Sequence, residues 1–173
     1  MKSEYINPFV TSTTSVFETM LGCQVTRMGL ELKSGSQPDL EVSGVIGLSA
    51  KASGVVVLSL CREAALGVTE AMLGARPASV DADVIDAVGE VVNMIAGGAK
   101  AQLEQYATSM GIPSVIVGKN HVISFPSQVT PFSILFDCPL GQLRIEVGLI
   151  EQPVEPAAVT DKAAALTKQL RQG

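Results

Sequence analysis

Residues 80–110 read VDADVIDAVGEVVNMIAGGAKAQLEQYATSM, and this stretch decides the fold class. Its apolar residues recur every three or four positions, which is the period of an α-helix. On a helical wheel one side collects the apolar residues Val84, Val88, Val92, Ile95, Ala99, Leu103 and Tyr106. Ser79 is the predicted N-cap, and Gly111 and Pro113 are predicted to end the helix. The pattern therefore predicts one long amphipathic helix with a single face towards a core.

The opposite side of this predicted helix carries a narrow polar stripe. Five residues fall within about 80° of one another on the wheel: Asp86, Glu90, Asn93, Gly97 and Lys100. The two carboxylates repel each other at i, i+4, and the asparagine and glycine are poor helix formers. Such locally unfavourable choices tend to mark function. Acidic residues on an exposed helix are nevertheless common, so these residues alone leave a plain solvated face as the more frequent explanation.

Three glycines of this helix predict close approaches. Gly97 lies in the stripe itself, where the missing side chain would let another molecule come near the backbone. Gly89 and Gly98 lie at the two flanks of the stripe, where packing against a neighbouring helix is the simplest prediction.

Runs of apolar residues outside this helix predict a sheet. Strands are predicted over residues 23–33, 40–48, 54–60, 114–117, 121–125, 132–137 and 143–150, and further helices over 6–21 and 62–73. Because the strands come in hairpin runs, we expect an α+β fold of two layers: a largely antiparallel sheet with long helices packed on one face. The strand groups on either side of the helices also suggest two similar halves.

The chain has the size and composition of one domain. Its 173 residues are 47% hydrophobic and 17% charged, which fits a globular protein with its own core. The domain is predicted to cover residues 1–153. Pro153 and Pro156 separate it from a tail, residues 154–173, that contains a short Ala-rich helical pattern.

Composition also argues against several functions. The formal net charge is −5 and the basic residues are scattered, so neither nucleic acid nor a membrane is an expected partner. Residues 1–8 lack the features of a signal peptide, which predicts a cytoplasmic protein. Three cysteines with no metal-binding or CxxC spacing predict no metal site. No nucleotide-binding, nucleophile-elbow or zinc-protease motif occurs, and a lone histidine, His121, is more often structural than catalytic.

Residues 86–93, Asp-Ala-Val-Gly-Glu-Val-Val-Asn, resemble the signature of the CheC/CheX/FliY phosphatases of bacterial chemotaxis. That signature has Asp or Ser, then Glu four residues on, then Asn three residues further, and a proline after the helix, for which Pro113 is the match. The order of predicted elements is similar over roughly residues 4–151. CheC-type proteins carry Glu and Asn on two helices, whereas here Glu18 of the first helix is followed by Leu21. The chain therefore resembles the CheX type.

The resemblance implies a phosphatase that hydrolyses the aspartyl phosphate of a CheY-like response regulator. Asn93 would position the attacking water, and Glu90 would pair with the regulator's active-site lysine. We expect Asp86, Gly97 and Lys100 to contact the partner. No cofactor is expected on this chain, because the phosphorylated partner brings its own Mg²⁺. The resemblance also implies a homodimer through a sheet edge. The alternative is a non-catalytic module of the same fold that binds a receiver domain or a flagellar-motor component.

Overall fold

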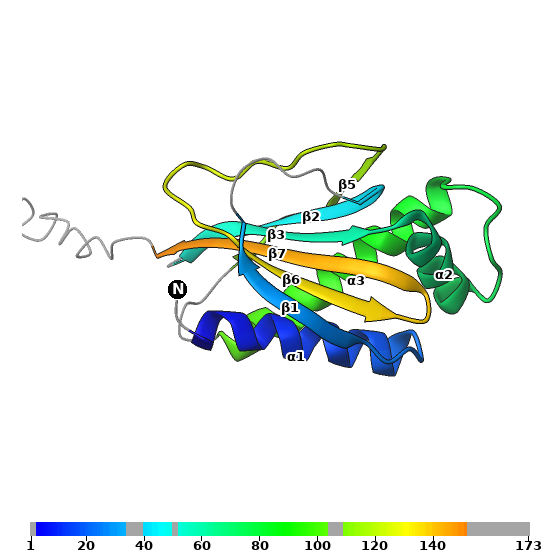
Figure 1. The fold of residues 1–173 in the computed structure, drawn as a ribbon, viewed down its shortest axis with the longest axis horizontal. Coiled ribbons are helices and arrows are strands. Elements are labelled where there is room, and N and C mark those ends of the chain that lie inside the picture. Colours follow the sequence, from blue (N-terminus) through cyan, green and yellow to red (C-terminus); the bar gives the residue numbers. More distant parts are fainter. Residues whose placement is uncertain (1–2, 34–39, 50–51, 104–108, 152–173) are drawn as a thin grey trace, which may run out of the picture.

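The computed structural model describes residues 3–33, 40–49, 52–103 and 109–151 of the chain. Figure 1 shows a twisted sheet with helices α1 and α3 lying along one face and α2 at one end. The elements in chain order are α1 (Ser3–Met20), β1 (Thr26–Leu32), β2 (Val42–Ser49), β3 (Ala52–Leu60), α2 (Arg62–Leu73), α3 (Ala82–Gln102), β4 (Ser109–Met110), β5 (Ser114–Val117), β6 (Phe132–Cys138) and β7 (Gly141–Glu151).

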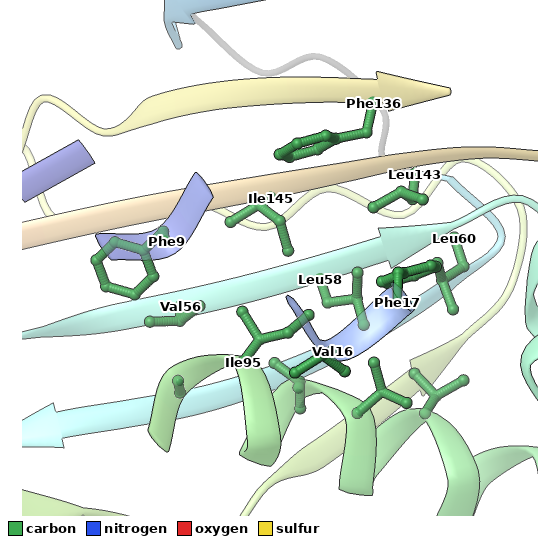
Figure 2. Packing of buried hydrophobic residues seen from close by; sticks show 14 of the residues in the cluster. Phe9, Val16, Phe17, Val56, Leu58, Leu60, Ile95, Phe136, Leu143 and Ile145 are labelled. Atoms are coloured by element: carbon green, nitrogen blue, oxygen red, sulfur yellow. The ribbon is translucent and has the colours of Figure 1, made fainter. Parts of the chain in front are cut away.

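The described strands form one antiparallel sheet in the order β1-β6-β7-β3-β2, with β4 and β5 both paired to β2. Side chains alternate across it, and one face is apolar. Figure 2 shows Phe9 and Phe17 of α1 and Ile95 of α3 meeting β3 and β7 residues such as Leu58 and Ile145. The predicted α+β fold with helices on one face of an antiparallel sheet is therefore confirmed.

The topology has two similar halves, as the sequence suggested. One half is α1, β1, β2 and β3, and the other is α3, β5, β6 and β7. The last strands of the two halves, β3 and β7, pair at the centre, and each forms a hairpin with the strand before it. Each remaining strand, β1 or β5, pairs with the hairpin of the other half. From either edge of the sheet, the strands therefore follow in the same order when the equivalent strands of the two halves are matched.

The helix predicted over residues 80–110 is shorter than expected at both ends. Its N-cap is Asp81 rather than Ser79, because the Asp81 carboxylate accepts a hydrogen bond from the backbone N–H of Val84 at 3.2 Å. The helix ends at Gln102. Met110, predicted as its last residue, instead lies in β4 against β2, where the neighbouring Gly111 N–H donates to Gly47 O at 3.0 Å. Backbone pairing at the sheet edge thus takes the place of the predicted helix at Met110.

The predicted core face of α3 is confirmed. Six of its seven predicted members are buried: Val84, Val88, Val92, Ile95, Ala99 and Leu103. The seventh, Tyr106, lies outside the described residues. The predicted tail, residues 154–173, also lies outside the described residues. No helix within the described ranges has the length and apolar character that crossing a bilayer requires.

The strand predicted over residues 121–125 is wrong. This part of the chain belongs to an irregular segment that covers the sheet face opposite the helices. Gly148 of β7 leaves room for it, since a Cβ there would lie 2.6 Å from Phe125. His121 is fixed by side-chain bonding instead of a strand ladder: its ring contacts Ser43 Oγ at 2.8 Å and Gly118 O at 2.7 Å. Packing and polar contacts with the sheet therefore override the local strand pattern.

Candidate functional site

The predicted polar stripe lies on the side of α3 that faces away from the sheet. Asp86 and Glu90 are exposed, whereas Asn93, Gly97 and Lys100 are partly covered. From Asp86 to Asn93 the helix rises about 10 Å, so one protein surface could contact all three polar side chains. The hydrogen bonds and ion pairs among the described residues do not involve the side chains of Asp86, Glu90 or Asn93. These groups are therefore available to a partner.

The buried side of α3 holds the stripe in a fixed position. Small residues let the helix approach the sheet closely: a Cβ on Gly44 of β2 would lie 2.9 Å from the Cγ1 atom of Val92. On this buried side of α3, Val88 and Val91 have no exposed surface. Close packing of this kind resists sliding or rotation of the helix.

One flank of the stripe is packed against α1. The Ser12 hydroxyl donates a hydrogen bond to Ile95 O at 2.8 Å, across the two helices. A Cβ on Gly98 would lie only 2.4 Å from that hydroxyl oxygen. The prediction of helix–helix packing at Gly98 is therefore confirmed, and the absence of a side chain there sets the distance between the helices.

The other flank is covered by the segment that leads into β5. A Cβ on Gly89 would contact Val115 at 3.7 Å and Pro113 at 3.9 Å, so the prediction that Gly89 packs against a helix is wrong. The same segment passes Gly97, where a Cβ would lie 3.9 Å from Met110. Met110 thus borders Gly97 on this side. Pro113, distant from the stripe in sequence, lies next to α3 in space.

The stripe offers hydrogen-bonding and charged groups to a partner. Within the described residues no group of three or more His, Cys, Asp or Glu side chains is placed to hold a metal ion. His121 binds Ser43, whose side chain points away from α3, so the imidazole lies across the sheet from the stripe. Burial raises the pKa of the Cys138 thiol to about 11, which keeps it protonated and unreactive near neutral pH. What remains is a carboxylate and an amide presented side by side.

The chain is an α+β protein with long helices on one face of an antiparallel sheet, and known proteins share this fold. The family model described as "Chemotaxis phosphatase CheX" matches residues 42–137. CheX from Vibrio vulnificus is 31% identical, with a TM-score of 0.79 over 85% of this chain and 99% of that chain. CheX from Desulfovibrio desulfuricans is 34% identical, with a TM-score of 0.77 over 85% and 99%.

A third similar structure is a chain of the CheX–CheY–BeF₃–Mg²⁺ complex from Borrelia burgdorferi. It is 25% identical, with a TM-score of 0.72 over 85% of this chain and 98% of that chain. No curated protein sequence matches the chain. The family match and the identity above 30% over most of the chain are decisive: the chain belongs to the CheX family of chemotaxis phosphatases.

Proposed function

We propose that this protein accelerates hydrolysis of the aspartyl phosphate on a CheY-like receiver domain, with Asn93 and Glu90 as its catalytic residues. The observation that carries the proposal is the geometry of α3, where an exposed carboxylate and a partly covered amide stand about one turn apart on a tightly packed helix. Membership of the CheX family supports the phosphatase activity. The solved complex of a Borrelia CheX with CheY supports the choice of partner.

In this proposal Asn93 orients the attacking water. A water oxygen forms a bond to phosphorus while the bond from phosphorus to the aspartyl oxygen breaks, which yields inorganic phosphate and a free aspartate. The Asn93 amide can donate one hydrogen bond and accept another, so it can fix both the position and the direction of the water. An amide suits this place because a carboxylate would repel the negatively charged phosphoryl group.

Glu90 and the rest of the stripe hold the partner. The exposed Glu90 carboxylate is free to pair with the lysine beside the phosphorylated aspartate, which aligns α3 over the phosphoryl group. Asp86, Gly97 and Lys100 extend the contact along the helix. The Mg²⁺ required for the reaction belongs to the receiver domain, as the composition of the Borrelia complex supports.

We also propose that two copies pair through β1. This strand is an edge strand of the sheet, and all seven of its residues are exposed, including Met28, Leu30 and Leu32. Unpaired backbone groups next to apolar side chains make such an edge a template for a second strand. Light scattering should give the mass of a dimer for the wild type and of a monomer for Leu30→Lys. A dimeric Leu30→Lys variant would point to another surface.

The test of the phosphatase proposal is the lifetime of a phosphorylated CheY-like receiver domain from the same organism. We expect the wild-type protein to shorten it, Asn93→Ala to remove the effect, and Glu90→Ala to weaken it. Equal acceleration by the wild type and both variants would refute the assignment. Binding of the phosphorylated receiver without faster hydrolysis would favour the non-catalytic alternative.

A further inference from the structure

One apolar side chain in the segment between β4 and β5 is almost completely exposed. Ile112 has 92% of its surface accessible, the most of any large apolar residue in the described chain. A single exposed apolar residue is ordinary on a protein surface. Ile112 differs because two further apolar residues nearby are exposed. Ile85 of α3 has 39% of its surface accessible, and Val117 of the neighbouring strand β5 has 45%.

The contacts of its neighbours show where the backbone of Ile112 lies along α3. The segment runs antiparallel to α3, because Met110 lies at Gly97 while Pro113 and Val115 lie at Gly89. Gly97 and Gly89 are about 12 Å apart along the helix, and Asn93 is midway between them. Ile112 falls between Met110 and Pro113 along the same path. The backbone of Ile112 therefore passes α3 near the level of Asn93, and its exposed side chain is left uncovered there.

The same geometry carries the apolar surface along the stripe towards Asp86. Beyond Val115 the strand continues to Val117, whose register partner Val42 points into the core, so Val117 faces the helical side of the sheet. Ile85 lies one turn of α3 before Gly89, on the same flank. We name Ile112, Val117 and Ile85 the apolar rim.

The two flanks of the stripe are bordered by different elements, the segment that carries Ile112 on one side and α1 on the other. Gly89 and Gly98 point in nearly opposite directions on the helical wheel. Gly98 faces α1 across a close contact, so α1 occupies the far flank. A protein that contacts Glu90 and Asn93 from the side of the β5 segment would therefore also cover the apolar rim.

We propose that the apolar rim, with Ile112 as its main contact, is the surface on which the phosphorylated receiver domain docks. The proposal rests on the proposed function, and its occupant is the same receiver domain because the rim is continuous with the stripe. Apolar contact at the rim contributes equally before and during the reaction, so it strengthens binding of the partner without changing the chemical step. Ile112 is thus a positioning residue that sets affinity, whereas Asn93 sets the rate.

The test is Ile112→Ser, measured in two assays. Binding to the receiver domain activated with beryllofluoride and Mg²⁺ gives Kd, and turnover of the phosphorylated receiver gives KM and kcat. We expect Kd and KM to rise about tenfold, because the variant loses the burial of one aliphatic side chain in the complex. We expect kcat to stay within twofold of the wild-type value. Because the side chain is exposed, the variant should fold as the wild type does.

Met20→Ser is the matched control. Met20 is also a large exposed apolar residue (56%), but it ends α1, the helix on the opposite flank of α3. Its substitution should leave Kd and KM unchanged, and Ile112→Val should also retain wild-type values. An unchanged Kd for Ile112→Ser, or an equal loss for Met20→Ser, would overturn the docking proposal.

The outcomes separate docking from catalysis. If Asn93→Ala removes hydrolysis while Ile112→Ser binds normally, the phosphatase proposal stands and the apolar rim is refuted. If the wild type binds but does not hydrolyse and Ile112→Ser weakens binding, the apolar rim stands and the phosphatase proposal is refuted. Absence of any wild-type binding would overturn both.

Discussion

Helices α1 and α3 occupy equivalent places in the two halves of the fold, yet only α3 presents the proposed site. The two helices meet at Ser12 and Gly98, which is where equivalent residues of two symmetric halves would touch. Asn7 of α1 and Asn93 of α3 are as far apart in the sequence as Ser12 and Gly98 are, so they too occupy equivalent positions. The same separation relates Glu4 to Glu90, so the first helix has its own Glu-x-x-Asn sequence.

The difference between the two asparagines lies in their surroundings. Asn7 is exposed in the first turns of α1, next to Pro8, which lacks the N–H of a regular helical bond. Asn93 is partly covered in the middle of a regular helix, with the segment from Met110 to Val115 along its flank. Both helices therefore have the Glu-x-x-Asn spacing, and the proposed site on α3 differs in its regular helix and in the segment that borders it.

Replacing each asparagine in turn tests this difference between the two helices most directly. Asn93→Ala should lower kcat for receiver dephosphorylation by about 10²–10³-fold, the usual loss when one preorganised polar group is removed from a reaction centre. Asn7→Ala should leave kcat within twofold. Single-turnover assays on the phosphorylated receiver measure both. A comparable loss for Asn7→Ala would show that α1 carries a second working site.

The contact between the two helices can be tested through stability. Gly98→Ala places a Cβ against the Ser12 hydroxyl, so we expect a loss of about 1–3 kcal/mol in the free energy of unfolding, measured by urea denaturation. Exchanging the pair, with Ser12→Gly and Gly98→Ser together, should recover most of this loss because the halves are equivalent at the crossing. A double variant no more stable than Gly98→Ala would argue against that equivalence.

Glu90 gives a smaller effect on the same helix. Glu90→Ala should reduce kcat/KM about tenfold, because an exposed ion pair with a partner contributes roughly 1 kcal/mol or slightly more. Asp86→Asn, one turn earlier, is the control and should change kcat/KM less than threefold. Equal losses for the two would indicate that general negative charge, rather than the position of Glu90, matters.

Much of the fold was predictable because its signals are local. The apolar face of α3 and the hairpin of β6 and β7 follow from periodicity and turn residues, and Gly74 ends α2 in the left-handed conformation that glycine favours (φ 77°). The end of α3 was not predictable from the same signals. Helical periodicity continues past Gln102, and only the distant edge of β2 gives Met110 and Gly111 other partners.

The candidate site also has one part that could be predicted from local sequence and one part that depends on distant contacts. The stripe could be predicted from the helical wheel, because its residues are close in sequence. The neighbours of the stripe could not, since Met110, Ile112 and Pro113 reach it only through the pairing of β4 and β5 with β2. The equivalence of Glu4 and Asn7 to Glu90 and Asn93 could not be predicted, because it depends on the contact between Ser12 and Gly98. The residue of α1 that corresponds to Glu90 is Glu4 and not Glu18.

The smallest effect is expected at Gly97, the residue before Gly98 in α3. Gly97→Ala should raise the free energy of unfolding by up to about 1 kcal/mol, because alanine is the better helix former and its Cβ would make only ordinary contact with Met110 at 3.9 Å. Gly98→Ala, one residue on, is expected to have the opposite sign. Urea denaturation of both variants measures the difference. Destabilisation by Gly97→Ala would mean that the Met110 segment packs against α3 more tightly than these contacts indicate, and would weaken the case for an accessible stripe.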